Sequence, residues 1–235
     1  MASVQRPPVS QDSDISAYLS RRDASFIATY STNMSIIQGI SIAFAADKFL
    51  ATFSPVFSRG RLNVDDWQNI FAFVCTIVVF AWVAVEYYWF MTVIKRRPAP
   101  RDTVVHFSLG AVQCLLGLSV GRFDQWVFCL ILVCVVGLVA HANSLANLRQ
   151  AENADQIKLY AKRSIFRHIG YVVIALTTVV ICYMLELNDV INKFSVFAIF
   201  AAVAIACLAL IVSSSSRSLR RIEKLATESG WAARL

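Results

Sequence analysis

The chain has 235 residues, of which 57% are hydrophobic and 16% are charged. Soluble domains average about 45–50% apolar and about 25% charged residues, so this composition excludes an ordinary soluble domain and indicates a protein that lies in a lipid bilayer. The formal net charge of +7 follows from the membrane topology argued below, so the sequence predicts no nucleic-acid partner.

The N-terminal segment, residues 1–25, is polar and precedes the first apolar run. That run begins too late and is too long for the core of a signal peptide, so we expect it to be retained as a membrane span. Within the segment, Ile15, Tyr18, Leu19 and Arg22 recur at helical spacing. This pattern predicts a short amphipathic helix on the cytoplasmic surface.

Apolar runs of membrane-spanning length fill residues 26–213. About 20 helical residues cross a hydrocarbon core roughly 30 Å thick, and six windows qualify: 26–46, 69–93, 104–121, 125–142, 168–187 and 194–213. The third and fourth are predicted to form a tight hairpin, because one continuous helix would overshoot the bilayer. Asp65 or Asp66 is expected to cap the second span. The predicted fold is all-α, a polytopic membrane protein with six transmembrane helices and cytoplasmic helical extensions.

The lysine and arginine residues predict the orientation of these spans. With the N-terminus in the cytoplasm, 17 of them lie on the cytoplasmic side and 5 on the other side. The positive-inside rule gives this asymmetry for a plasma-membrane or bacterial inner-membrane protein with both termini in the cytoplasm. Basic clusters beside spans also attract anionic lipid, by about 1 kcal/mol per residue.

The first span carries an unusual number of hydrogen-bonding side chains. At about 100° per residue, Ser31, Ser35 and Gln38 fall within one narrow sector of the helix. One interpretation is packing, in which small and polar residues let helices approach and bond to one another. The other is a hydrated path, in which polar side chains replace the water around an ion or solute.

Glu86 is an acidic residue well inside an apolar run, "VFAWVAVEYYWFM". A charged side chain at the bilayer centre costs at least about 2.5–3.5 kcal/mol, so acids in this position usually serve a function. We interpret Glu86 as a proton or cation site. The alternative is that Tyr87, Tyr88 and Trp89 mark the membrane interface, where Glu86 reaches water or a neighbouring base.

Three histidines and six cysteines are the candidates for metal or redox chemistry. His106, His141 and His168 fall at the predicted cytoplasmic ends of spans three, four and five, a placement that fits a metal or haem site or polar anchors at the interface. The cysteines lie inside spans without a Cys-x-x-Cys pair, which indicates buried thiols. Because motifs for phosphate, metal and nucleophile chemistry are missing from the sequence, we predict no catalytic residue, no metal site and no cofactor.

Helices are also predicted beyond the bilayer, between the fourth and fifth spans and in the tail, residues 214–235. Helical stripes run through residues 145–148 and 157–164 with a break near Asn153, and an amphipathic pattern follows "SSSS". Such stubs are too short to fold alone. We expect them to bind another copy, one another, the lipid surface or a cytoplasmic protein. The candidate interaction residues are Arg149, Lys158, Lys162, Arg163, Arg220 and Arg221.

These patterns predict a small channel or transport-type protein, homo-oligomeric, with a polar path lined by the first span. Glu86 is its expected charge-selecting or protonatable group. The alternative is a membrane sensor or anchor subunit that recruits a cytoplasmic protein through the basic hairpin and tail. An intramembrane enzyme that acts on lipid or quinone is the third possibility, because its active site could use dispersed residues that form no motif.

Overall fold

The computed structural model describes residues 11–93, 100–149 and 155–228, and within them it contains six α-helices and no strand. Residues 1–10, the predicted break near Asn153 and the last residues of the tail lie outside these ranges. The helices are α1 (Gln11–Arg59), α2 (Val64–Val93), α3 (Pro100–Leu118), α4 (Phe123–Leu148), α5 (Asp155–Leu187) and α6 (Lys193–Glu228).

The prediction of an all-α, polytopic membrane protein is confirmed. Five stretches are long and apolar enough to cross a bilayer: Thr32–Val56, Val64–Trp89, Phe123–Leu148, Asp155–Leu187 and Lys193–Arg221. The stretch Asp102–Leu118 of α3 is apolar but shorter. Its 17 residues reach about 25 Å at the helical rise, slightly less than a hydrocarbon core of about 30 Å.

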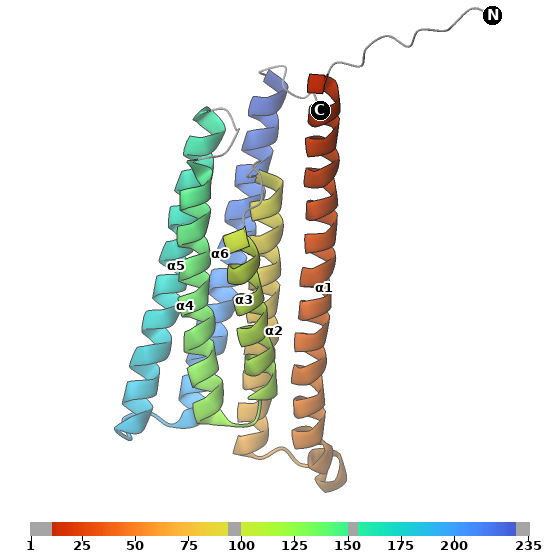
Figure 1. The fold of residues 1–235 in the computed structure, drawn as a ribbon. Helices are drawn as coiled ribbons and strands as arrows, with labels where there is room; N and C mark the ends of the chain where they lie inside the picture. The colour runs from red at the N-terminus through yellow and green to blue at the C-terminus, as the bar shows by residue number, and fades with distance from the viewer. Residues whose placement is uncertain (1–10, 94–99, 150–154, 229–235) are drawn as a thin grey trace, which may run out of the picture.

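The six helices pack as a ring. Helix α1 packs on α2 and α3, α2 packs on α6, α6 on α5, α5 on α4, and α4 on α3, which closes the circle. The helices run roughly side by side in Figure 1, and the three short connections α1–α2, α3–α4 and α5–α6 lie together at one end. We call this the turn end. The opposite end, which carries the exposed basic residues of α5 and α6, is called the basic end.

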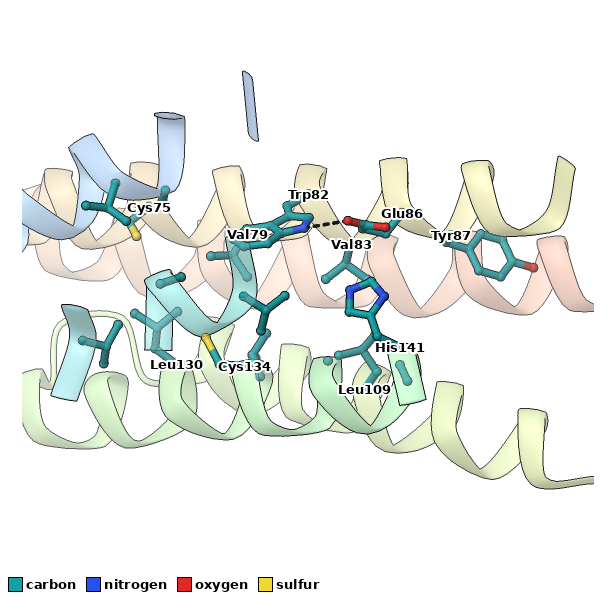
Figure 2. A pocket seen from close by; sticks show the side chains of 18 of the residues that line it. Cys75, Val79, Trp82, Val83, Glu86, Tyr87, Leu109, Leu130, Cys134 and His141 are labelled. Atoms are coloured by element: carbon teal, nitrogen blue, oxygen red, sulfur yellow. Dashed lines mark hydrogen bonds between the residues drawn. The ribbon is translucent and has the colours of Figure 1, made fainter. Parts of the chain in front are cut away.

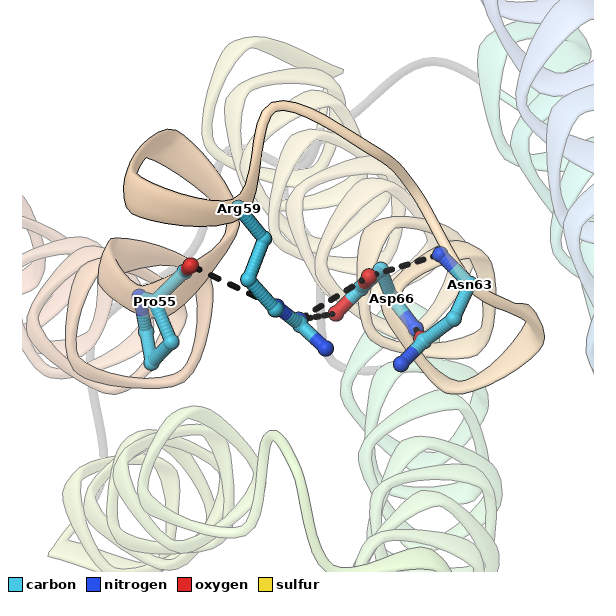
Figure 3. A network of polar contacts seen from close by, with 4 residues as sticks. All are labelled: Pro55, Arg59, Asn63 and Asp66. Atoms are coloured by element: carbon cyan, nitrogen blue, oxygen red, sulfur yellow. Dashed lines mark hydrogen bonds and ion pairs between the residues drawn. The ribbon is translucent and has the colours of Figure 1, made fainter.

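The α1–α2 connection is fixed by a network of polar contacts (Figure 3). Asn63 caps α2, because its Oδ1 accepts a bond from the backbone N–H of Asp66 at 2.8 Å. Asp66 Oδ2 accepts in return from the backbone N–H of Asn63 at 2.8 Å, which is a reciprocal capping arrangement. Arg59 donates to both carboxylate oxygens of Asp66, at 3.0 and 3.2 Å. The predicted cap at Asp65 or Asp66 is therefore corrected to Asn63, with Asp66 as its partner.

Aromatic side chains fill the ring at the turn end. Trp126 of α4 is completely buried, and its Nε1 donates to Thr76 Oγ1 of α2 at 2.9 Å. Its ring lies 5.2 Å from that of Phe197 and 5.9 Å from that of Phe200, both on α6. Because buried aromatic pairs of this kind contribute about 0.5–1.5 kcal/mol beyond their buried area, this cluster holds α2, α4 and α6 together.

Helices α1 and α3 approach closely at Gly117. A Cβ atom at this position would lie 2.7 Å from the backbone oxygen of Ser41 and 3.2 Å from the backbone nitrogen of Ala45. Ser41 is buried, and its hydroxyl donates to the Ile37 carbonyl at 2.8 Å. Small residues therefore set the distance between these two helices, as is usual for packing in membranes.

We expect Gly117→Ala to destabilise the protein, because the added methyl group meets backbone atoms that cannot rotate away. The expected loss is about 1–3 kcal/mol, measurable as a lower melting temperature of the purified protein in detergent. Gly39→Ala is the matched control, since a Cβ there meets nothing within 4 Å. An equal loss of stability in both variants would contradict close packing at Gly117.

Two helices continue without a break across predicted segment boundaries. Helix α1 is continuous from the N-terminal segment into the first span, and α6 is continuous from the sixth span into the tail. At the basic end, Trp89, Leu148, Ala161 and Ile165 form a buried cluster against which Leu219 packs. The predicted helical extensions are thus present and pack on one another.

Candidate functional site

A cavity of about 110 Å³ lies inside the ring (Figure 2). All six helices contribute to its wall, so the whole bundle converges on this space. The wall is mostly apolar. One lining residue from each helix, in chain order, is Met34, Val83, Leu109, Val133, Val179 and Ala204.

Glu86 of α2 supplies the acidic group of the cavity. Its side chain is 14% exposed, and Oε2 lies 2.7 Å from Nδ1 of His168 on α5. The other oxygen, Oε1, accepts a bond from Trp82 Nε1 at 3.2 Å, one helical turn earlier on α2 (Figure 2). Both oxygens therefore have a partner inside the bundle, which offsets the cost of holding an acid within a membrane span.

His168 is fixed from all sides. Its side chain is fully buried, its ring lies 5.4 Å from the Trp89 ring and 6.2 Å from the Tyr171 ring, and its Nε2 lies 3.5 Å from Ser164 Oγ. Packing of this kind leaves the imidazole one orientation, with Nδ1 toward Glu86. The pair links α2 to α5, which are not neighbours in the ring.

The Glu86–His168 pair can exist in two charge states. With Glu86 ionised and the imidazole neutral, Nδ1–H donates to the carboxylate, Nε2 is an acceptor, and the net charge is −1. One further proton brings the net charge to zero. The contact at 2.7 Å is a hydrogen-bond distance between the ring nitrogen and the carboxylate in either state.

Two more histidines lie beside this pair. His141 of α4 lines the cavity with its ring directed toward Glu86 in Figure 2, and its ring lies 6.2 Å from that of His168. His106 of α3 also lines the cavity, with its ring 5.8 Å from that of Tyr87. Among the described residues, no group of three or more potential ligands is arranged to hold a metal ion.

A second polar cluster joins α3 to α4 at the basic end. Asp102 is buried, and its Oδ1 accepts bonds from the side-chain amides of Asn143 at 2.8 Å and Asn147 at 2.9 Å. Its backbone carbonyl contacts Nδ1 of His106. Because His106 also lines the cavity, its contact with the backbone of Asp102 joins the cavity to this cluster.

The predicted polar stripe of the first span lies away from the cavity. Ser35 is exposed on α1 and Gln38 is half-buried, whereas the side chain of Ser31 lies outside the described part of the chain. Helix α1 contributes Met34 to the cavity wall. Among the predicted path residues whose side chains the structure describes, Glu86 lines the cavity, whereas Ser35 and Gln38 do not. A pore-lining role for Ser31, Ser35 and Gln38 stays a prediction.

The predicted interaction residues lie at the surface of the basic end. Arg149, Lys162, Arg163, Arg220 and Arg221 are exposed and Lys158 is half-buried. The guanidinium of Arg221 lies over the Tyr160 ring at 5.1 Å, which links α6 to α5 at the basic end. All six cysteines are free, and five are buried while Cys114 is half-buried.

The sequence did not identify His168 as the partner of Glu86. The sequence did carry a usable signal. Because consecutive spans run in opposite directions, all three histidines and Glu86 fall near the same end of the bundle. Four titratable side chains at one depth of a bundle are close enough to interact when their helices face a common centre.

Comparison of the chain with protein-family models, with curated proteins and with solved structures finds no match.

Proposed function

We propose that this protein is a proton-linked transporter, in which the central cavity holds the solute and the Glu86–His168 pair binds the proton. The observation that carries this proposal is the buried carboxylate of Glu86, which lines a cavity formed by all six helices and lies 2.7 Å from the imidazole of His168. Acidic groups inside membrane spans are costly and commonly mark proton relays. Here the acid lines a cavity with a volume suited to a small solute.

The two ends of the cavity differ in a way that suits transport. Toward the turn end, the buried aromatic cluster of Trp126, Phe197 and Phe200 separates the cavity from the short connections. Toward the basic end, His106 and the Asp102 cluster offer polar groups along which protons can exchange. We infer that the described conformation exchanges protons with the basic end, and that transport requires the aromatic cluster to open.

Proton flux into liposomes tests this proposal. Full-length protein is reconstituted into vesicles that contain a pH-sensitive dye, and a pH gradient is applied with the membrane potential clamped. The proposal predicts a protein-dependent change of internal pH in the presence of a transported solute. Flux equal to that of protein-free vesicles, across a panel of small cationic, neutral and anionic solutes, would contradict it.

A second candidate function is a membrane anchor for a soluble partner. It is favoured by the packed helical extensions at the basic end, which present Lys162, Arg163 and Arg220 on their exposed side. Exposed basic residues contribute little to the fold, since surface ion pairs are worth about 0–1 kcal/mol. These residues can therefore be substituted to test their role while the helical bundle stays folded.

The anchor candidate predicts that a variant with Lys162→Gln, Arg163→Gln and Arg220→Gln loses a protein that is cross-linked to the wild type in intact membranes. Proton flux should be unchanged in this variant, because none of the three residues lines the cavity. These substitutions are preferable to deletion of the tail, since Leu219 packs on the buried cluster of the extensions. An identical set of cross-linked proteins in both forms would count against the anchor.

A further inference from the structure

The size of the cavity restricts its ligand to a compact molecule. Its volume of about 110 Å³ is of the same order as an engineered protein cavity of about 150 Å³ that binds benzene. A ligand of about six to eight non-hydrogen atoms is therefore of the right size. A phospholipid or a tailed quinone is larger than this space, so a compact molecule matches it better.

The wall of the cavity selects against anions and against sugars. Most of its side chains are aliphatic or aromatic, and no lysine or arginine is among the described residues that line it. An anion would meet the Glu86 carboxylate without a compensating positive charge. A sugar would leave several hydroxyl groups without hydrogen-bond partners, each at a free-energy cost.

The end of the cavity around Glu86 is instead suited to a positive charge. Trp82, Tyr87 and Trp89 also line the wall, each within about one helical turn of Glu86 on α2. Aromatic faces attract ammonium groups, and a carboxylate forms its strongest hydrogen bonds with charged donors. Glu86 retains acceptor capacity, because its two oxygens offer about four lone-pair sites and bind one donor each from Trp82 and His168.

We propose that the cavity binds a small organic monocation, an amine with a compact apolar body, and that its ammonium group replaces the second proton of the Glu86–His168 pair. This inference rests on the proposed function, in which the cavity is the solute site. The pair with one proton has a net charge of −1, and either a second proton or the ammonium group neutralises it. The proton and the amine therefore compete for the same site. The released proton passes to water and then to the buffer, and no covalent bond to carbon forms or breaks.

The groups around Glu86 define where this exchange takes place. Helices α1 and α6 contribute residues without titratable groups to the cavity lining, such as Met34 and Phe200. The histidines of the other helices provide alternative positions for the released proton before it reaches water. The titratable groups that share the cavity or contact Glu86 are His168 of α5, His141 and Cys134 of α4, His106 of α3, and Tyr87 and Cys75 of α2.

Three probes of nearly equal size and different charge test the ligand class. Benzylammonium, benzyl alcohol and benzoate are titrated into purified full-length protein in detergent, with binding followed by isothermal titration calorimetry. We expect benzylammonium to bind at least about tenfold more tightly than benzyl alcohol, because only the amine forms a charge-assisted bond. Benzoate should give no binding signal. Tighter binding of benzyl alcohol or benzoate, or binding of none of the three, would overturn the proposal.

Glu86→Gln is the variant that tests the site itself. The amide keeps the shape of the side chain and its bond to Trp82, so the cavity should remain while the charge is lost. We expect the preference for benzylammonium over benzyl alcohol to disappear in this variant. Glu186→Gln should keep the preference. Glu186 lies near the turn end, where its Oε1 is 3.9 Å from Nζ of Lys193. Unchanged amine binding in Glu86→Gln would place the amine elsewhere.

Proton release tests the exchange. The measured enthalpy of benzylammonium binding is compared in buffers that differ in ionisation enthalpy, at several pH values. The proposal predicts release of up to one proton per bound amine. The number of released protons should fall as pH rises, because the pair has then already lost its second proton before the amine binds. An enthalpy that is the same in all buffers at every pH would overturn the exchange. Amine binding with proton release but without flux in liposomes would contradict the transporter alone, so the two proposals can fail separately.

Discussion

Glu86→Gln should abolish proton flux in reconstituted vesicles and leave the helical bundle folded. The side chain keeps its volume, and its amide oxygen can still accept from Trp82, whose Nε1 lies 3.2 Å from the carboxylate in the wild type. The group that alternates between charged and neutral forms is lost, however. We therefore expect the rate of internal pH change to fall to that of protein-free vesicles, while the melting temperature shifts only slightly.

The matched control for this prediction is Glu186→Gln. Glu186 also lies on a membrane-spanning helix, with a side chain that is 14% exposed, but it lies near the turn end of α5 and contacts Lys193 instead of a histidine. Flux in this variant should stay near the wild-type rate. Equal loss of flux in both variants would indicate a general effect of removing acids, and retained flux in Glu86→Gln would exclude Glu86 as the proton-binding group.

His168→Leu should destabilise the protein strongly. The substitution removes the partner of a buried carboxylate, and leaving a buried charge without its partner typically costs about 3–5 kcal/mol. The imidazole of His168 is fully buried, and the side chain of Glu86 is only 14% exposed. Water therefore cannot easily replace the lost hydrogen-bond donor. The measurement is thermal or denaturant unfolding of the purified protein in detergent, followed by the loss of helical structure.

The double variant Glu86→Leu, His168→Leu provides the control for this effect. With both polar groups replaced by apolar side chains of similar size, no unpaired charge remains. Such replacements are often neutral or stabilising, by about 1–4 kcal/mol. We therefore expect stability close to or above that of the wild type, combined with loss of flux. If the double variant is as unstable as His168→Leu, the loss reflects packing of the histidine and not the charge of Glu86.

The helices and their order follow from the sequence, because long apolar runs and helix-ending residues are local signals. The position of Glu86 inside a span was likewise visible as an acid in an apolar run. Its partner was not. Contact between Glu86 and His168 depends on how α2 and α5 are rotated about their axes, and that rotation is fixed by the packing of all six helices into the ring.

The contact between α1 and α3 shows the same limit. The sequence predicts that Ser31, Ser35 and Gln38 share one sector of the first span, and the helices approach each other further along α1, where Gly117 meets Ser41 and Ala45. Close packing in a membrane depends on small residues of both helices at one level. The small residue on the partner helix lies more than seventy positions further along the chain, so the pattern of α1 alone does not reveal which of its sides faces the bundle.

The most direct test of this account is infrared difference spectroscopy of the full-length protein during pH titration, with and without benzylammonium. We predict a protonation signal from the Glu86–His168 pair that is missing in Glu86→Gln and that moves to lower pH when the amine is present, because amine and proton compete for the same carboxylate. A signal that persists in Glu86→Gln, or one whose pH dependence is unaffected by the amine, would contradict the claim that this pair couples proton binding to the cavity.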